Sequence, residues 1–301
     1  MTKILVTGGT VFVSRYIAEY YVKKGCDVYV LNRNSRPQSP GVTLIEADRH
    51  DLSEVLRPYE FDAVIDTAYS ARDVDLLLDA LGKYNQYVLI SSSAVYPEHT
   101  EQPFREDSSL SANRYWGKYG TDKIEAEQAL QKRVPHAYIF RPPYLYGPMN
   151  NVYREAFVFE CALSGRPFYI PRDGSMRLQF FHIHDLCRFI DLVLEKLPEE
   201  HIFNVGNAET ISVRDWVTLC YEVAGKVACL HSVYEDIDQR QYFSFYDYEY
   251  QLDVSRMSKI MENTIPLKIG LKAAFDRYVQ NPGEVNKKGF IDFIEGHLKQ
   301  A

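Results

Sequence analysis

The first half of the chain alternates short apolar runs with longer stretches whose apolar positions have helical spacing. Residues 3–6 form an apolar run that ends in Thr-Gly-Gly, and residues 12–24 carry apolar groups at helical spacing before Gly25. Further strands are expected at 27–31, 43–45, 63–65, 87–90 and 136–140, and further helices at 74–81 and 116–131. Continuous Val/Ile/Leu strands separated by helices indicate a parallel sheet covered on both faces. The pattern therefore predicts an α/β fold with a doubly wound, Rossmann-like parallel sheet.

The regular alternation weakens after Arg141-Pro142-Pro143. We expect helices at 153–163, 184–194 and 213–224 and a strand at 202–205, whereas residues 232–250, rich in Tyr, Phe, Asp and Glu, receive no assignment. The predicted division is a dinucleotide-binding domain over residues 1–165, which also receives parts of 180–206. Residues 166–301 are predicted to form a smaller, discontinuous α/β lobe that binds the substrate.

Composition excludes several classes of protein. The 301 residues carry a formal charge of −7 and are 46% hydrophobic and 25% charged, which is typical of a soluble globular protein and argues against a nucleic-acid partner. The five cysteines are scattered without metal-ligand spacing, so we expect reduced thiols. No apolar run approaches 18 residues and the chain enters a strand at once, so we expect neither a membrane span nor a signal peptide, and a cytoplasmic location.

The segment TGGTVFVS, residues 7–14, resembles a dinucleotide-binding loop with two glycines replaced. Gly8 and Gly9 suit the tight turn, but Val11 stands where a glycine lets the backbone approach the pyrophosphate, and Ser14 stands where a glycine allows close packing of helix on strand. The helix N-terminus keeps its backbone N–H groups for phosphate. The segment by itself leaves two interpretations open, a working cofactor loop and a simple strand-to-helix turn.

The end of the second predicted strand bears on the choice of cofactor. The acidic residue that accepts a ribose 2′-hydroxyl is missing, and Asn32-Arg33 stands there instead. An arginine suits a 2′-phosphate, so the sequence favours NADP over NAD, although Arg33 also fits a solvated surface charge.

The chain contains two Tyr-x-x-x-Lys patterns, Tyr20/Lys24 and Tyr119/Lys123. On a helix this spacing places the phenol and the ammonium one turn apart, where the cation stabilises the phenolate of a group whose ordinary pKa is about 10. Only Tyr119/Lys123 lies downstream of a hydroxyl-rich strand end, at 91–96. In doubly wound sheets ligands bind at the carboxyl ends of strands, so this second pair is the candidate for acid/base catalysis of hydride transfer.

Six segments in order along the chain resemble the extended short-chain dehydrogenase/reductases, the nucleotide-sugar epimerase/dehydratase family. The segments are TGGTVFVS at 7–14, ISSSAVYP at 90–97, YGTDKIEAE at 119–127, RPPYLYGP at 141–148, FFHIHDL at 180–186 and FNVGNAETISV at 203–213. They cover nearly the whole length.

The resemblance implies roles for individual residues. Tyr119 resembles the acid/base tyrosine and Lys123 the lysine that holds the cofactor, with Ser92 as the hydroxyl partner and Ser93 as its alternative. The implied cofactor-binding residues are Gly8, Gly9, Thr10, Val11, Phe12, Val13, Asn32, Arg33, Asp48, Arg49, Ala68, Lys123, Pro142 and Tyr144, with Asp48 and Arg49 beside the adenine. The implied substrate-binding residues are Ser93, Asn150 and Arg177.

One departure from the family pattern concerns the substrate diphosphate. Many relatives carry Arg-Asp where this chain has Leu178-Gln179, and Arg177 one residue earlier would point to the opposite face of a strand. A shifted loop would restore the contact, or Arg172 would replace it. The opening loop and Leu-Gln-Phe resemble a subset of the family that includes chloroplast stem-loop RNA-binding relatives.

The histidine-rich stretch His182-Ile183-His184-Asp185 has two interpretations, a metal cluster and a helix start that serves the fold. Within the matched family segment these residues fit helix capping and packing, so no metal is expected.

The predicted function is an NAD(P)-dependent epimerase, dehydratase or reductase that acts on a sugar hydroxyl or carbonyl, with a nucleotide sugar as substrate. The alternative is a non-catalytic cofactor-sensing or RNA-binding protein on the same scaffold, against which the Ser/Tyr/Lys set argues. The resemblance also implies a homodimer formed through helices of the first domain, with the helix that carries Tyr119 as a candidate face.

Overall fold

The computed structural model describes residues 2–298, and the chain divides into two compact units. The first unit is built from residues 1–143, 183–206 and 252–263, and the second from 144–182, 207–251 and 264–301. Residues 144–165 thus belong to the second unit, whereas we expected them in the first. The chain leaves the first unit at Pro142-Pro143, where two successive residues lack the N–H that a sheet ladder needs.

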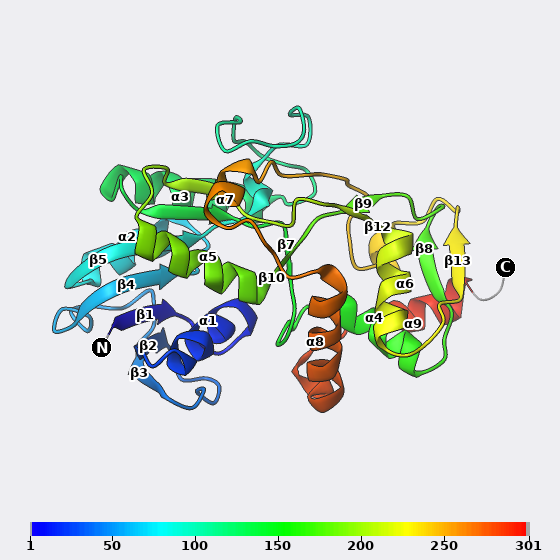
Figure 1. The fold of residues 1–301 in the computed structure, drawn as a ribbon, viewed down its shortest axis with the longest axis horizontal. Coiled ribbons are helices and arrows are strands. Elements are labelled where there is room, and N and C mark those ends of the chain that lie inside the picture. Colours follow the sequence, from blue (N-terminus) through cyan, green and yellow to red (C-terminus); the bar gives the residue numbers. More distant parts are fainter. Residues whose placement is uncertain (1, 299–301) are drawn as a thin grey trace. The chain divides into compact units, whose positions relative to one another are not determined.

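The first unit contains the predicted doubly wound parallel sheet, which is confirmed. Seven strands pair in the order β11-β6-β5-β4-β1-β2-β3, all in parallel (Figure 1). The strands are β1 (Lys3–Thr7), β2 (Asp27–Asn32), β3 (Val42–Glu46), β4 (Glu60–Asp66), β5 (Lys83–Ile90), β6 (Tyr138–Arg141) and β11 (Ile202–Asn204). From β1 the chain proceeds outward to β2 and β3 on one side, and later to β4, β5 and β6 on the other. The order reverses between β1 and β4, and in such sheets this switch point is where ligands bind.

Helices cover the sheet of the first unit. They are α1 (Phe12–Lys23), α2 (Ala71–Ala80), α3 (Lys118–Arg133), α5 (Ile183–Lys196) and α7 (Ser255–Ile260), with a short 3-10 turn η1 (Ser93–Val95). Helix α2 packs beside α3, and α1 packs beside α5. One core layer joins strand residues such as Leu5 and Val64 to Leu77 of α2 and Leu130 of α3, all buried. Burying these apolar groups on both sheet faces fixes the strand ends that carry the candidate site.

The second unit combines three small sheets with a helical core. The strand pairs are β7 (Tyr144–Tyr146) with β10 (Phe180–His182), β8 (Phe168–Pro171) with β13 (Leu230–Val233), and β9 (Arg177–Leu178) with β12 (Ile211–Ser212). The helices are α4 (Glu155–Leu163), α6 (Val213–Val223), α8 (Leu267–Gln280) and α9 (Phe290–Phe293), with short turns η2 (Gln239–Gln241), η3 (Pro282–Glu284) and η4 (Ile294–Leu298). Helices α4, α6 and α8 pack on one another.

The segment that received no assignment, residues 232–250, contributes aromatic side chains to the core of the second unit. Phe243 and Phe245 are buried, and Phe245 packs edge-on against Trp216 with ring centroids 5.2 Å apart. Apart from the end of β13 and the turn η2, this segment is irregular. Its composition therefore reflects packing rather than a repeating element.

Within residues 2–298 the structure contains no helix that is both long and apolar enough to cross a membrane.

Candidate active site

The loop after β1 requires glycine at positions 8 and 9, because of its backbone conformation and its close neighbours. Gly8 and Gly9 have φ values of +89° and +88°, a region that strains other residues. A Cβ on Gly9 would lie 2.5 Å from Cγ1 of Val30, and a Cβ on Gly8 would lie 2.8 Å from Oγ of Ser14. Ser14 therefore fits in the helix because Gly8 leaves space for its hydroxyl, which donates to the Val11 carbonyl (3.2 Å).

The N-terminus of α1 begins at this loop. Val11 is its N-cap residue with an extended backbone (φ −134°), so its position does not require glycine. No side chain of the described residues caps the helix, and its first turn has no acidic residue. The backbone N–H groups of the first turn, flanked by the predicted residues Thr10, Phe12 and Val13, thus remain the means of binding a phosphate there.

The end of β2 places the Asn32 side chain against the loop that follows β1. Asn32 Nδ2 donates to the Gly8 carbonyl (2.6 Å), and its Oδ1 accepts from Gln38 Nε2 (3.1 Å). Arg33 is exposed and lies 3.8 Å from the carboxylate of Asp48, with which it forms a weak ion pair. Asn32 stabilises the turn, while Arg33 and Asp48 lie together at the surface.

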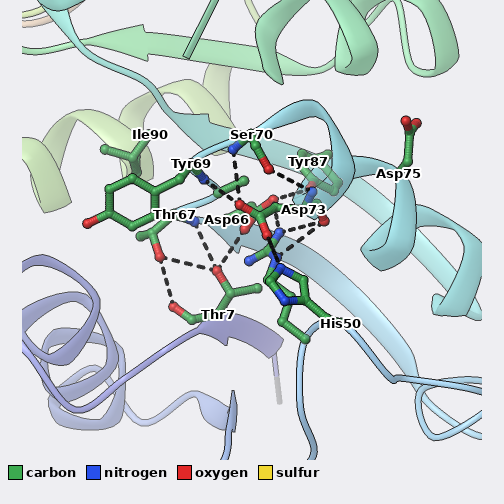
Figure 2. Close-up of polar contacts among 12 residues, drawn as sticks. Thr7, His50, Asp66, Thr67, Tyr69, Ser70, Asp73, Asp75, Tyr87 and Ile90 are labelled. Atoms are coloured by element: carbon green, nitrogen blue, oxygen red, sulfur yellow. Dashed lines mark hydrogen bonds and ion pairs between the residues drawn. The ribbon is translucent and has the colours of Figure 1, made fainter. Parts of the chain in front are cut away.

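A buried polar cluster lies at the switch point between β1 and β4. We call it the Asp66 cluster, and it comprises Thr7, Arg49, Asp66, Asp73 and Tyr87. Figure 2 shows most of its members around the ends of these strands. Asp66 is fully buried and accepts from Thr7 Oγ1 (2.7 Å), Tyr87 OH (2.5 Å) and Arg49 Nη2 (2.8 Å). Arg49 also donates to the Asp73 carbonyl, so its side chain, predicted to lie beside adenine, is turned into the protein.

The cluster also anchors the loop after β4. Asp73 accepts from the backbone N–H groups of Tyr69 and Ser70 (3.0 Å each), and Ser70 caps α2 in return (Figure 2). His50 lies 2.9 Å from the same Asp73 carboxylate. Burial and the neighbouring Asp66 raise the pKa of Tyr87 well above its ordinary value, so its phenol stays protonated and donates. No pattern in the sequence pointed to Asp66, because it ends an apolar strand and its partners are remote in the chain.

Tyr119 and Lys123 lie on α3, and the lysine reaches the strand ends. Lys123 is only 3% exposed, and its Nζ donates to the carbonyls of Ala68 (2.6 Å) and Ile90 (2.9 Å), which follow β4 and end β5. The same nitrogen lies 6.0 Å from the ring centroid of Tyr119, which is 39% exposed. An ammonium has three hydrogens, and two are used here. Burial lowers the pKa of Lys123 to about 8, although Asp66 and Glu127 favour its charged form.

The backbone around Gly120 brings α3 against the serine-bearing turn. A Cβ on Gly120 would lie 2.5 Å from the Ala94 carbonyl, so only glycine allows this approach. Ser92 is half-buried and caps the turn η1 by accepting from the Ala94 N–H (3.2 Å). Ser93 is buried, and its N–H donates to the Pro142 carbonyl (2.9 Å). The structure therefore brings Ser92, Ser93, Tyr119 and Lys123 to one end of the sheet, on α3 and the turn against which it packs.

An ion pair buried behind these residues fixes α3 to the sheet. Glu127, one turn after Lys123, binds the guanidinium of Arg141 (2.6 Å) and accepts from Ser91 Oγ (2.5 Å). Arg141 also donates to Tyr96 OH (2.8 Å). This network joins α3, β6 and the end of β5, so it holds the helix that carries Tyr119 in register with the serines.

The remaining predicted residues lie in the second unit, where protein groups already bind them. Asn150 is buried and donates to Glu155 Oε1 (2.8 Å). Arg177 Nε donates to Thr210 Oγ1, and Arg177 Nη2 donates to the Thr210 carbonyl (2.6 Å each). Tyr144, the first residue of β7, is buried with its ring 5.2 Å from the guanidinium carbon of Arg154.

Arg172 and the histidine-rich stretch likewise have protein partners. Arg172, the alternative diphosphate ligand, pairs with Asp247 (3.2 Å). His184 contacts Tyr16 OH (3.3 Å), and Asp185 pairs with Arg188 (2.7 Å). Over residues 2–298 no group of three His, Cys, Asp or Glu side chains is arranged to hold a metal ion.

The sheet order, the glycine loop and the Ser/Tyr/Lys set define a dinucleotide-binding α/β protein. The model of the NAD dependent epimerase/dehydratase family matches residues 4–206. The chain belongs to this family, and the predicted family and enzyme class are confirmed.

Two characterised relatives are similar over most of the chain. The chloroplast stem-loop binding protein of 41 kDa b of Arabidopsis thaliana is 26% identical over 86% of this chain and 74% of the relative. The UDP-glucose 4-epimerase of Corynebacterium glutamicum is 26% identical over 74% of this chain and 80% of the relative.

Solved structures share the fold. The UDP-glucose 4-epimerase of Thermotoga maritima, solved with UDP-glucose, superposes with a TM-score of 0.75 at 18% identity and covers 93% of this chain and 100% of its own. The UDP-glucuronic acid 4-epimerase of Bacillus cereus, in complex with UDP-glucuronic acid and NAD, has a TM-score of 0.72 at 22% identity, with 93% and 99% covered.

Proposed function

We propose that this chain is an NAD(P)-dependent epimerase, dehydratase or reductase that acts on a hydroxyl or carbonyl group of a nucleotide-linked sugar. The observation that carries the proposal is the placement of Lys123, a buried ammonium 6.0 Å from the Tyr119 ring that contacts carbonyls and, among residues 2–298, no carboxylate. Such a cation costs free energy to bury, and it is useful where a phenolate must form. The glycine loop and the uncapped N-terminus of α1 suit the pyrophosphate of a dinucleotide.

Each residue of the set has one role. When bound, the nicotinamide accepts or returns a hydride at the sugar carbon. Tyr119 takes the proton of the sugar hydroxyl as the carbonyl forms, and returns it in the reverse direction. Lys123 stabilises the Tyr119 phenolate and offers its third hydrogen to the cofactor ribose. Ser92 donates to the reacting oxygen, with Ser93 as the alternative donor.

The choice between NAD and NADP depends on Arg33. No carboxylate ends β2 to accept a 2′-hydroxyl, and Arg33 is paired only loosely with Asp48. We propose that Arg33 binds a 2′-phosphate and favours NADP. Arg33→Ala should then weaken NADP binding about tenfold and leave NAD binding within about twofold. Equal effects on the two cofactors would contradict this preference.

The proposed function is tested by native mass spectrometry of the purified protein, followed by assay with nucleotide sugars. We expect co-purified dinucleotide, and a change of the sugar that is seen by NMR and lost in Tyr119→Phe. A tightly retained oxidised cofactor would favour an epimerase or dehydratase, which regenerates it in each cycle. Absence of hydride chemistry on any nucleotide sugar, together with RNA binding at physiological salt, would replace the proposal by the RNA-binding alternative. The formal charge of −7 argues against that alternative.

Two further features belong to this proposal. A homodimer would form through helices of the first unit, and size-exclusion chromatography with light scattering measures it directly. The unpaired cysteines, of which Cys161, Cys187 and Cys220 are buried, suit a reducing compartment such as the cytoplasm.

A further inference from the structure

Tyr69 is an exposed aromatic residue at the end of the sheet where ligands are expected. It follows β4 in the loop at the switch point, between the buried Ala68 and the half-buried Ser70. It is 63% exposed, the largest value for a large apolar side chain among the described residues of the first unit. An exposed ring buries little apolar area, so packing does not account for a tyrosine at this position.

The backbone around Tyr69 is fixed from both sides. The Tyr69 N–H donates to the Asp73 carboxylate (3.0 Å), and the carbonyl of the preceding residue, Ala68, accepts from Lys123 Nζ (2.6 Å). In Figure 2 the Tyr69 ring is directed away from the carboxylates of Asp66 and Asp73. The loop therefore holds this ring outside the Asp66 cluster.

The ring of Tyr69 lies against both members of the acid/base pair. Lys123 Nζ is 5.1 Å from the centroid of the Tyr69 ring, closer than the 6.0 Å that separates it from the centroid of the Tyr119 ring. The two tyrosine rings make an edge-to-face contact, with centroids 6.0 Å apart and planes at 61°. An ammonium within about 6 Å of a ring centroid is attracted by the electrons of the ring face. Tyr69 thus contacts the cation and the candidate phenol together.

A ring face differs from a carboxylate as a partner for this ammonium. Two hydrogens of Lys123 Nζ go to carbonyls, and among residues 2–298 no carboxylate contacts this nitrogen. A carboxylate would neutralise the ammonium, and the lysine would then offer little attraction to a phenolate. A ring carries no net charge, so it stabilises the cation and leaves the positive charge available to Tyr119.

We propose that Tyr69 is a positioning residue for the acid/base pair: its ring face holds the Lys123 ammonium, and its edge-to-face contact orients the Tyr119 ring. This inference rests on the proposed function, because the pair is useful only where Tyr119 must become a phenolate. The contact favours the charged lysine, so it opposes the burial that lowers the pKa of Lys123 to about 8. The other charges that act on this lysine are Asp66, Glu127 and Asp73, which favour its charged form, and Arg49, which opposes it.

The test changes the ring of Tyr69 and follows the titration of Lys123 by NMR in the full chain. Tyr69→Leu keeps an apolar side chain but removes the ring face, and Tyr69→Phe keeps the ring without the hydroxyl. The carbon-13 signal of Lys123 Cε, identified by its loss in Lys123→Met, reports the protonation of the ammonium. We expect Tyr69→Leu to lower the pKa of Lys123 by about 0.5 to 1, which is a change of about three- to tenfold in its protonation equilibrium. Tyr69→Phe should change this pKa by less than about 0.3.

The direction of the change separates this role from simple cover. If Tyr69 only shielded the ammonium from water, the smaller leucine would admit water and raise the pKa of Lys123. Tyr234→Leu is the control, because Tyr234 is 71% exposed and belongs to the second unit, and it should leave the titration unchanged. A pKa of Lys123 that rises or stays the same in Tyr69→Leu would overturn the inference. An equal fall in Tyr69→Phe would also overturn it, because the hydroxyl rather than the ring face would then be responsible.

The pH dependence of kcat tests whether the contact serves catalysis. Activity that depends on a charged Lys123 falls as the lysine loses its proton, so the alkaline limb of the kcat profile should move to lower pH in Tyr69→Leu by the same amount as the NMR titration. In Tyr69→Phe this limb should stay in place. A limb that stays in place in Tyr69→Leu while the lysine titration moves would overturn the positioning role of Tyr69. Absence of hydride chemistry in the wild type would contradict the proposed function instead, and the lysine titration would still measure the contact.

Discussion

Two Tyr-x-x-x-Lys pairs with identical spacing have opposite surroundings in this protein. On α1, Tyr20 OH and Lys24 Nζ both donate to Asp191 Oδ2, the lysine at 2.7 Å, and the Lys24 side chain is 47% exposed. Burial and Asp191 raise the pKa of the Tyr20 phenol. On α3, Lys123 is buried and contacts no carboxylate of the described part of the chain, and burial lowers its pKa to about 8. The four-residue spacing brings a tyrosine and a lysine together in both places. The neighbouring charge then decides whether ionisation of the tyrosine phenol is opposed or favoured.

The residue after each tyrosine explains part of this difference. Tyr21 follows Tyr20 and is buried as a large side chain in the core, whereas Gly120 follows Tyr119 and lets α3 approach the turn at Ala94. The glycine is therefore a local signal that a helix approaches a strand end closely. That approach brings the helix that carries Tyr119 against the serine-bearing turn η1.

The largest expected contrast is in turnover. Tyr119→Phe should lower kcat about 10²- to 10⁴-fold, because the proton acceptor is removed, while cofactor binding is retained. Tyr20→Phe is the matched control: it should leave kcat unchanged and cost about 1 kcal/mol of stability through the lost bond to Asp191. Steady-state kinetics and urea unfolding measure both. Full activity in Tyr119→Phe would show that Tyr119 is no more catalytic than Tyr20, and would contradict the contrast drawn between the two pairs.

The second contrast is the pH dependence of stability. Lowering the pKa of Lys123 from 10.5 to about 8 corresponds to about 3 kcal/mol against folding below pH 8, where the lysine is charged in both states. Between pH 8 and 10.5 the unfolded chain binds more protons, so the stability of the wild type should rise with pH. Relative to Lys123→Met, the wild type should gain about 2 kcal/mol between pH 7 and 9.5.

Lys24→Met serves as the control for this measurement. Lys24 is exposed and paired with Asp191, so Lys24→Met removes a lysine from the same spacing pattern without removing a buried ammonium. Denaturant unfolding of the three proteins at both pH values decides the matter. Parallel pH profiles for wild type and Lys123→Met would show that the burial of Lys123 carries no cost.

A smaller effect is expected from Gly120→Ala. The added Cβ would meet the Ala94 carbonyl at 2.5 Å, which costs about 1–3 kcal/mol, while the gain in helix propensity offsets about 1 kcal/mol. We expect a net loss of about 1 kcal/mol and a lower kcat, because the helix moves away from Ser92. Gln128→Ala, at an exposed position of the same helix, should change neither quantity.

The smallest effect is expected at the N-terminus of α1, at Val11. Val11→Gly should change the Kd for NAD less than about threefold, because Val11 already has an extended backbone that glycine does not improve. Gly9→Ala is the comparison, since a side chain there would overlap Val30 and strain the loop. A large gain in affinity for Val11→Gly would mean that the missing glycine weakens the site.

The sequence predicted the sheet, which is confirmed, and it pointed to Tyr119 and Lys123 as catalytic candidates, because both inferences rest on local patterns. Short apolar runs that alternate with helical stretches predict the strands of a parallel sheet. Tyr119 and Lys123 are four residues apart, so their pairing on a helix is also visible in the sequence. The Asp66 cluster could not be predicted in this way, because Arg49, in the loop after β3, and Tyr87, within β5, are both remote from Asp66 in the chain. Because Asp66 ends an apolar run, the sequence indicated only the end of a strand there and gave no sign of its buried partners.

The elements of the second unit were harder to predict from the sequence, for a different physical reason. Its strands are two to four residues long, too short for a period to be read, and its core is filled by aromatic side chains from irregular segments. Helix α8 (Leu267–Gln280) received no assignment in advance, although its capping residue Pro266 is a usable start signal.

The network behind α3 has a consequence for how the polypeptide is made. Asn204 of β11 accepts from Tyr96 OH (2.7 Å), and its N–H donates to Glu106 (3.0 Å), so the sheet of the first unit is completed by residues that follow α4 and α5 in the chain. The ribosome synthesises the chain from its N-terminus, so Glu106 is made about a hundred residues before Asn204, whose N–H it accepts. Until β11 emerges, β6 is an open sheet edge that can pair with another nascent chain, and a chaperone bound there would protect it.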